Sequence, residues 1–298
     1  MTLLSTLSGT LVPSVGLGTF PLQGRQMADV LLEAVKIGYR LIDTSDDYHG
    51  ESGIGMGCSE LYDKTGLHRE DIFIQTKISQ DNSFLYEPLS GIWFNPNSVF
   101  QQRHSVSEII RDKVHISLKE MGTDYLDSLL IHYPYPAYYE EIWDVFIELQ
   151  KAGIVRFIGV SNFFPKHIEK LKPSGVNPTI NEVFFSPQCT RNDVLNYCRT
   201  NDILPICYSC LSGINGQIPQ DVIRPIMENH NKSMSQIILR WHIDRGCLPL
   251  ARSKTSSRLV ENFDVFDFTL SPDEIDTLSS LNKNYLNILP ESRYCPGL

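Results

Sequence analysis

The chain has 298 residues, enough for one barrel-type domain or for two smaller domains. It carries 26 lysine and arginine residues against 35 aspartate and glutamate residues, which gives a formal net charge of -9. This balance disfavours general electrostatic attraction to nucleic acid or to an anionic membrane, although a local basic cluster can still bind a small anion.

The amino terminus and the cysteines bear on the cellular compartment. Residues 1–5 lack the basic region and long apolar stretch of a signal peptide, and no apolar run reaches the roughly 18 residues of a membrane span. The seven cysteines are scattered and odd in number, which favours reduced thiols over a disulfide framework. Cys207 and Cys210 form a CxxC pair at the end of an expected strand. A redox CxxC motif should open a helix, so we interpret the two cysteines as small side chains packed near the strand end. We expect a cytoplasmic monomer without nucleic-acid or membrane partners.

Short apolar or β-branched runs alternate with amphipathic helical patterns along the chain. Strands are expected at residues 15–18, 40–42, 72–76, 128–131, 157–160, 179–183, 204–208 and 247–250. Helices are expected at residues 27–37, 59–64, 106–121, 139–151, 165–171, 192–200 and 233–244. This alternation, with no linker, predicts an α/β fold in which residues 1–298 form a single (β/α)8 TIM barrel.

A doubly wound sheet is the alternative fold. It lacks support because no GxGxxG follows an early strand: Gly53, Gly55 and Gly57 have the wrong spacing, and Gly16 and Gly18 lack a third glycine.

Three segments depart from the alternation. Residues 1–14 predict an N-terminal β-hairpin that could close the barrel floor. Residues 79–104 and 282–298 are too long for ordinary connections and predict extended loops at the C-terminal face of the barrel. Because residues 79–104 are rich in aromatic side chains, we expect an ordered flap over the site.

Polar residues follow the expected strands in order. They are Thr19, Asp43, Lys77, His132, Ser161, Asn162, Glu182, Tyr208, Ser209, Arg252 and Ser253. In a (β/α)8 barrel the carboxyl ends of the strands form the catalytic face, so these residues should share one site.

Asp43, Tyr48, Lys77 and His132 are the candidate catalytic residues. A nearby ammonium stabilises a phenolate, so Lys77 would lower the pKa of Tyr48. Asp43 would pair with Lys77 and keep it charged, while His132 would orient a substrate oxygen. Such a set can deliver a proton to a developing alkoxide, as carbonyl reduction requires.

The motifs around these residues resemble those of the aldo-keto reductases over nearly the whole chain. LIDTSDDYHGE at residues 41–51 is similar to the family's DTAxxYGNE segment. Further similarities are Thr76-Lys77, YLDSLLIHYP at 125–134, GVSNF at 159–163, and Ser253, Arg258, Glu261 and Asn262 ahead of VFDF at 265–268. The resemblance implies a barrel enzyme without a Rossmann fold that binds an extended nicotinamide cofactor, with Tyr48 as proton donor.

The resemblance also implies cofactor contacts. Those near the nicotinamide and pyrophosphate are Thr19, Asp43, Ser161, Asn162, Glu182, Tyr208, Ser209 and Leu211. Those matching the 2′-phosphate group are Arg252, Ser253, Thr255 and Arg258, and those matching the adenine contacts are Glu261 and Asn262. Guanidinium groups suit a phosphate, so we expect NADPH/NADP+, with NADH less favoured, and no metal.

Two departures from the family pattern stand out. Residues 250–253 read Leu-Ala-Arg-Ser where the family usually has Ile-Pro-Lys-Ser, and Glu182 stands where it usually has Gln. An ionised glutamate cannot donate a hydrogen bond to the carboxamide, and its charge would favour the cationic oxidised ring. We hypothesise a bias towards oxidised cofactor or alcohol oxidation; the alternative is a protonated or rotated Glu182 with little effect.

The expected activity is reversible hydride transfer between nicotinamide C4 and a carbonyl carbon, interconverting an aldehyde or ketone and an alcohol. The substrate pocket is expected to include Phe20, Trp93, Phe94 and Tyr133. Two alternatives remain: a Schiff-base aldolase using Lys77 as nucleophile, and a regulatory protein that senses the redox state of a bound nicotinamide.

Overall fold

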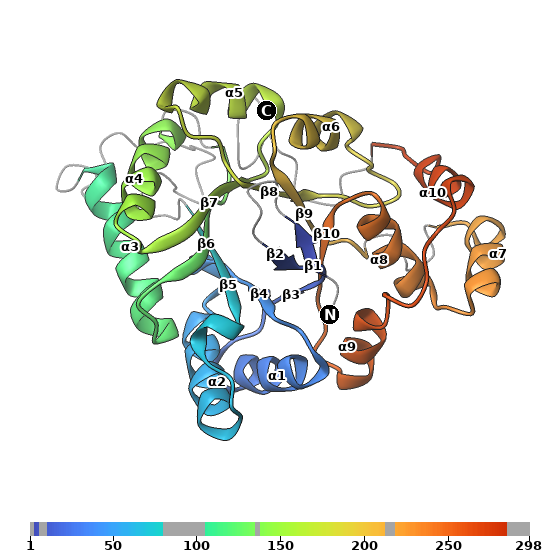
Figure 1. The fold of residues 1–298 in the computed structure, drawn as a ribbon, viewed down its shortest axis with the longest axis horizontal. Helices are drawn as coiled ribbons and strands as arrows, with labels where there is room; N and C mark the ends of the chain where they lie inside the picture. Colours follow the sequence, from blue (N-terminus) through green and yellow to red (C-terminus); the bar gives the residue numbers. More distant parts are fainter. Residues whose placement is uncertain (1–2, 6–10, 80–104, 135–137, 212–217, 285–298) are drawn as a thin grey trace, which may run out of the picture.

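The computed structural model describes residues 3–5, 11–79, 105–134, 138–211 and 218–284. Eight parallel strands close into a barrel in the order β10-β3-β4-β5-β6-β7-β8-β9 (Figure 1). Their bounds are β3 Gly16–Gly18, β4 Leu41–Asp43, β5 Phe73–Ile78, β6 Leu126–Ile131, β7 Val155–Ser161, β8 Ile180–Phe184, β9 Leu204–Tyr208 and β10 Leu248–Ala251. The predicted TIM barrel is confirmed, and the doubly wound alternative is wrong.

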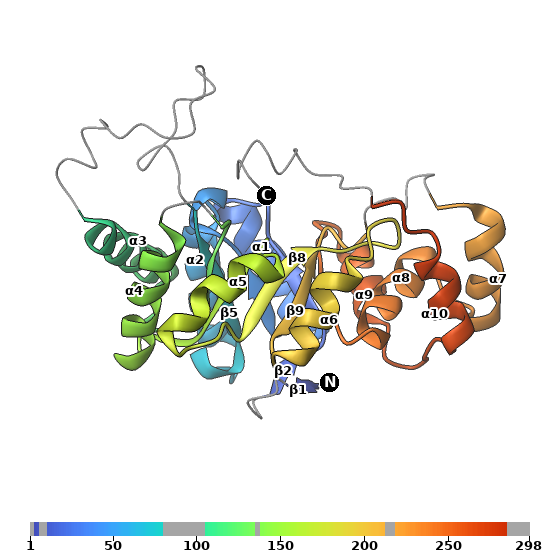
Figure 2. The same cartoon turned by 90° about the horizontal axis from the view of Figure 1, so that it is seen from above.

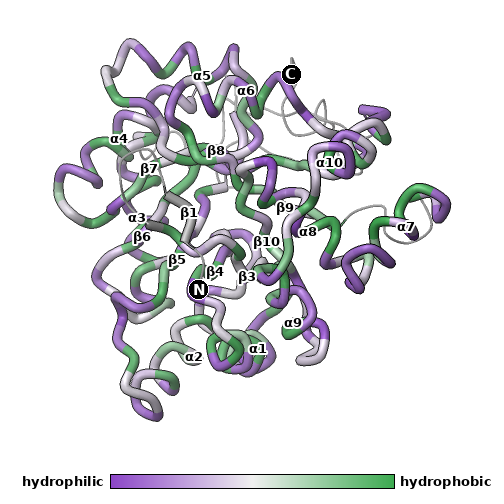
Figure 3. The backbone as a smooth tube through the Cα atoms, turned by 45° about the vertical axis from the view of Figure 1, so that its right-hand side comes forward, coloured by the Kyte–Doolittle hydropathy of each residue, from purple (hydrophilic) through white to green (hydrophobic). Residues whose placement is uncertain are grey.

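Helices surround the barrel. They are α1 Gly24–Ile37, α2 Glu51–Lys64, α3 Val106–Met121, α4 Tyr139–Lys151, α5 Pro165–Leu171, α6 Asn192–Thr200, α7 Gln220–His230, α8 Met234–Asp244, α9 Ser256–Phe263 and α10 Pro272–Ser279, with 3₁₀ turns η1 Asp46–Tyr48, η2 Arg69–Asp71 and η3 Lys172–Ser174. Capping boxes fix the starts of α3, α8 and α10, where Ser105, Ser233 and Ser271 accept the backbone N–H three residues on. In Figure 3 the outer helices alternate between hydrophobic and hydrophilic residues, as amphipathic helices do. Among the described residues, no helix has the length and apolar character needed to cross a membrane.

The structure corrects the predicted helices in two places. Helix α2 begins at Glu51 instead of residue 59, because glycines at 53, 55 and 57 hid its helical pattern. Helices α7, α9 and α10 were not predicted. Helix α7 contains Pro225, α9 is only 8 residues long, and α7 and α10 pack beyond α8 in a separate apolar cluster around Trp241, outside the regular βα repeat (Figure 1).

The N-terminal strands β1 (Leu3–Ser5) and β2 (Leu11–Pro13) pair in antiparallel register. Val12 is buried in one cluster with Leu41, Phe73 and Leu248, each the first residue of its barrel strand. The hairpin therefore covers the end of the barrel where the strands begin, as Figure 2 shows, and leaves the opposite end for a site.

The glycines of α2 allow close helix packing. A Cβ on Gly53 would lie 2.6 Å from the Gly24 carbonyl oxygen at the start of α1, and a Cβ on Gly55 would collide with the Glu120 carbonyl of α3. These glycines, which do not form a dinucleotide fingerprint, let α2 lie against both neighbouring helices.

Replacing Gly55 with alanine should destabilise the fold by about 1–2 kcal/mol, because the clash with backbone outweighs the better helix propensity of alanine. The measurement is the free energy of unfolding in urea. Gly66→Ala is the matched control: Gly66 is exposed and a Cβ there meets nothing within 4 Å. Equal effects of the two substitutions would contradict this packing account.

Candidate active site

The carboxyl ends of the strands bring the four candidate catalytic residues together. Asp43 is the last residue of β4, Tyr48 ends η1, Lys77 lies within β5 and His132 directly follows β6. Asp43 and Lys77 were predicted to follow their strands, whereas both lie inside them. They can do so because their polar groups find partners within the barrel mouth.

Lys77 is the centre of this group. Its side chain is 0% exposed, and its Nζ donates to Asp43 Oδ1 at 2.6 Å and to the carbonyl oxygen of Thr44 at 2.9 Å. A second ion pair joins Nζ to Glu182 Oε1 at 3.2 Å. Three acceptors thus match the three protons of the ammonium.

Lys77 stays charged in spite of its burial. Burial by itself lowers the pKa of Lys77, but the Asp43 carboxylate, with a further contribution from the Glu182 carboxyl, outweighs it and holds the pKa above its ordinary value. A fully charged ammonium has no lone pair, so Lys77 is unsuited to attack a carbonyl.

Gln75 joins the two carboxylates and was missed by the sequence reasoning. Its Nε2 lies 2.8 Å from Asp43 Oδ1 and 2.8 Å from Glu182 Oε2. The available signal was strand alternation: Gln75 lies two residues before Lys77, so both side chains point to the same face. Burial, reinforced by the charge of Asp43, raises the pKa of Glu182 well above its usual range, although Lys77 opposes this.

Tyr48 lies beside this cluster. Its ring centroid is 5.4 Å from Lys77 Nζ, 5.0 Å from the ring of Phe20 and 5.9 Å from the ring of His132. Burial raises the pKa of Tyr48 above its ordinary value; Lys77 lowers it, but nearby carboxylates raise it further. Lys77 therefore acts in the predicted direction, but burial of the phenol outweighs it, so the pKa of Tyr48 stays above its ordinary value.

His132 is a neutral imidazole. Its Nδ1 lies 2.5 Å from Ser79 Oγ and 3.2 Å from Ser45 Oγ, two positioning residues that the sequence reasoning missed. Burial lowers the pKa of His132 to about 4, although Asp47 opposes this shift. Nε2 forms no hydrogen bond with a residue in the described part of the chain, which leaves it available to an oxygen of a bound molecule.

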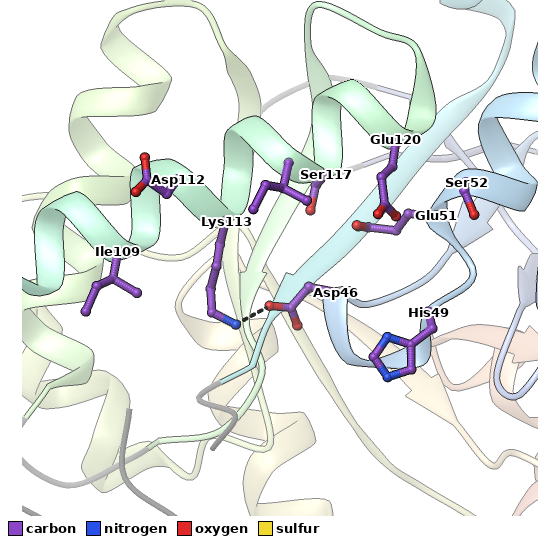
Figure 4. Close-up of a pocket in the computed structure, with 10 residues that line it drawn as sticks. Asp46, His49, Glu51, Ser52, Ile109, Asp112, Lys113, Ser117 and Glu120 are labelled. Carbon is purple, nitrogen blue, oxygen red and sulfur yellow. Dashed lines mark hydrogen bonds and ion pairs between the residues drawn. The ribbon is translucent and has the colours of Figure 1, made fainter. Parts of the chain in front are cut away.

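A cavity of about 590 Å³ lies outside the barrel mouth, between η1, α2 and α3 (Figure 4). Asp46 forms an ion pair there with Lys113 at 2.9 Å, and its other oxygen accepts from the backbone N–H of Ser79 at 2.9 Å. Asp46, which lines this cavity, therefore fixes the backbone of Ser79, whose hydroxyl contacts His132. Glu51, also in the wall, accepts from Thr76 Oγ1 at 2.7 Å, and burial raises its pKa to about 7.

The candidate nicotinamide contacts lie next to the cluster. Asn162 donates from Nδ2 to the His132 carbonyl at 3.0 Å and accepts from the Tyr208 hydroxyl at 2.7 Å. Ser161 Oγ donates to the Glu182 carbonyl at 2.9 Å. Thr19 Oγ1 is buried without a hydrogen-bond partner among the described residues. A buried hydroxyl without a partner fits a polar ligand such as the ribose of a nicotinamide cofactor.

The residues matched to the phosphate and adenosine end gather around the start of α9. Arg252 is exposed and its Nη1 donates to the Phe20 carbonyl at 2.8 Å, and Ser253 Oγ accepts from the Thr255 N–H at 3.0 Å. Arg258 is also exposed, and neither arginine pairs with a carboxylate of the described chain, so both are open to an anion. Glu261 and Asn262, matched to the adenine contacts, are half-buried and buried. Ser209 and Leu211, matched to the pyrophosphate contacts, follow β9 and are exposed and half-buried.

Part of the expected substrate pocket can be located. Phe20 is 53% exposed beside Tyr48, and the ring of Tyr133 stacks on His132 with centroids 4.7 Å apart. Trp93 and Phe94 lie outside the described residues, as do residues 80–104 of the expected flap and residues 285–298 of the C-terminal loop.

The pKa shift of His132 gives a testable pH dependence of stability. Because the folded-state pKa, about 4, lies below the ordinary value of 6.5, the unfolded chain gains a proton first as the pH falls. The contribution of the neutral His132 to the free energy of unfolding is therefore fully present above pH 6.5 and is lost as the pH falls towards 4. Between pH 7.5 and pH 5 the wild type should lose about 2 kcal/mol more unfolding free energy than His132→Gln. Parallel pH profiles for the two proteins would contradict a buried neutral imidazole.

The chain is similar over almost its whole length to known proteins. The family model described as the aldo/keto reductase family matches residues 14–218 and 219–283. The chain is 34% identical over 280 residues to glyoxal reductase of Bacillus subtilis, covering 93% of this chain and 91% of that protein. It is 32% identical over 286 residues to methylglyoxal reductase DkgA of Escherichia coli, covering 95% of this chain and 94% of that protein.

A solved structure of a relative extends the likeness to three dimensions. The Bombyx mori aldo-keto reductase in complex with NADP superposes with a TM-score of 0.83 at 28% identity, covering 98% of this chain and 96% of that one. The fold, the matched family model and the relatives agree. The chain belongs to the aldo/keto reductase family and is a nicotinamide-dependent oxidoreductase that acts on carbonyl groups.

Proposed function

We propose that this protein is an NADPH-dependent aldo-keto reductase in which Tyr48 is the general acid for reversible reduction of an aldehyde or ketone to an alcohol. The observation that carries the proposal is the buried Lys77 ammonium, paired with Asp43 at 2.6 Å and 5.4 Å from the Tyr48 ring. A fixed positive charge beside a half-buried phenol stabilises the phenolate that remains after proton donation.

The residues divide the work as follows. When bound, the cofactor supplies the hydride for the carbonyl carbon. Tyr48 gives its hydroxyl proton to the carbonyl oxygen, and Lys77 stabilises the resulting phenolate. Asp43 keeps Lys77 charged and in place. His132, neutral and anchored through Nδ1 by Ser79, donates from Nε2 to the same oxygen and orients it. In alcohol oxidation the same groups act in reverse.

The cofactor is held by residues already grouped at the barrel mouth. Asn162, Ser161, Glu182 and Thr19 would face the nicotinamide and its ribose, and Tyr208 would stack on the ring. Ser209 and Leu211 would contact the pyrophosphate, and Glu261 and Asn262 the adenine. At the other end Arg252 and Arg258, neither paired with a carboxylate of the described residues, would bind a 2′-phosphate together with Ser253 and Thr255. Two exposed guanidinium groups favour NADPH over NADH, because NADH lacks that phosphate.

The substrate is proposed to be a small carbonyl compound. The glyoxal and methylglyoxal reductases named above act on small aldehydes, and Phe20 and Tyr133 give this rim an aromatic character suited to a compact, partly apolar molecule. We further propose that the protein works as a cytoplasmic monomer.

Neither alternative activity is favoured by the geometry. A Schiff-base aldolase needs an uncharged lysine, whereas Lys77 uses all three protons on Asp43, Thr44 and Glu182. A regulatory protein that only senses the cofactor's redox state needs no proton donor. Rapid reduction of a carbonyl substrate by this protein would exclude a purely regulatory role.

The test combines turnover with cofactor binding. Wild-type protein should oxidise NADPH, followed at the nicotinamide absorbance, with at least one member of a panel of small aldehydes and dicarbonyls. Tyr48→Phe should lower kcat by about 10²–10⁴-fold, because the phenol proton is lost while the ring remains. Its Kd for NADPH, measured by fluorescence titration, should stay close to that of the wild type. Turnover by Tyr48→Phe near the wild-type rate would refute the assignment of the acid.

A further inference from the structure

Glu182 introduces a second acidic group into a buried cluster that has one cation. Asp43 and Glu182 both pair with Lys77, and all three residues are less than 5% exposed. With both carboxyls ionised the cluster would carry a net negative charge out of water, which is strongly unfavourable. One bound proton makes the cluster neutral.

The contacts indicate which carboxyl holds that proton. Gln75 Nε2 lies 2.8 Å from an oxygen of each carboxyl, so it does not distinguish them. Lys77 Nζ does, because it lies 2.6 Å from Asp43 Oδ1 but 3.2 Å from Glu182 Oε1, so the negative charge of Asp43 is the better compensated. The Glu182 carboxyl also lies within hydrogen-bonding reach of the Asp43 carboxyl, a contact that is attractive only when one of the two carries a proton.

Glu182 also faces the groups proposed to hold the nicotinamide ring. Its electrostatic influence reaches Tyr48 in η1 and Tyr208 in β9, and its own backbone carbonyl accepts from Ser161 of β7. The other charged groups around it are Asp43 on β4 and Lys77 on β5, while His132 after β6 is neutral. A cationic ring bound against Tyr208 and Asn162 therefore adds positive charge within electrostatic range of Glu182.

We propose that Glu182 carries a proton in the free enzyme and loses it when the oxidised cofactor binds, so that binding of NADP+, but not of NADPH, is coupled to release of about one proton. The inference rests on the proposed cofactor site. The carboxyl O–H bond breaks, the proton passes to the buffer, and the carboxylate left behind is stabilised by the cationic ring. The ring of NADPH is neutral and offers no such stabilisation, so Glu182 keeps its proton there.

Linkage makes the consequence measurable. Where NADP+ binding releases a proton, its Kd falls with rising pH, by up to about tenfold per pH unit, whereas the Kd for NADPH does not share this extra dependence. Both forms carry the same 2′-phosphate, so its own titration cancels in the comparison. The reduced cofactor is thus a matched control for the oxidised one.

The experiment is isothermal titration calorimetry of NADP+ and of NADPH at neutral pH, in buffers with small and large heats of ionisation. The dependence of the observed heat on the buffer heat gives the number of protons released. Wild-type protein should release about one proton more with NADP+ than with NADPH. Glu182→Gln, which keeps the size of the side chain but has no titratable proton, should abolish this difference. Tyr48→Phe should keep it, because the proton comes from Glu182.

The outcomes separate the two proposals. Binding of both forms with equal proton release by the wild type would overturn the inference alone, as would a difference that persists in Glu182→Gln. Loss of the difference in Tyr48→Phe would assign the proton to the phenol and would also overturn it. Failure of the wild type to bind either form would overturn the proposed cofactor site and the inference with it.

Discussion

The buried charge of Lys77 is the constraint on which the site depends. An ammonium without access to water must be surrounded by acceptors, and the fold supplies three from two strands: Asp43 and the Thr44 carbonyl at the end of β4, and Glu182 in β8. Both strands must be in register with β5, which carries Lys77. The closed barrel meets this requirement because parallel strands deliver all their carboxyl ends to one rim.

Residues one contact further from Lys77 hold the polar groups of the site in place. Gln75 fixes both carboxylates by donating to each, and Asp46 holds Ser79, which in turn anchors His132. The result is a site whose polar groups are set before any ligand arrives. Preorganised dipoles and charges of this kind need no rearrangement as negative charge develops on a substrate oxygen.

Much of this was readable from the sequence, and the failures have physical causes. The barrel could be predicted because apolar strands and amphipathic helices repeat with clear periods. The tetrad could be predicted because its members lie near the carboxyl ends of the consecutive strands β4, β5 and β6 or in the turn that follows β4. The start of α2 was missed because glycines at Gly53 and Gly55 weaken a helical pattern, although close helix contacts require them there. Gln75 was missed because pairing of side chains across the barrel is invisible to local periodicity. The raised pKa of Tyr48 was missed because it depends mainly on how deeply the fold buries the phenol.

The central claim is that the charge of Lys77 acts on catalysis through Tyr48. A double-mutant cycle tests it directly, using single-turnover reduction rates of the wild type, Tyr48→Phe, Lys77→Met and the double variant, with folding of each verified by circular dichroism. If Lys77 acts through the phenol, the double variant should be about as slow as Tyr48→Phe alone, because no phenolate remains to be stabilised. Losses that multiply in the double variant would contradict the account.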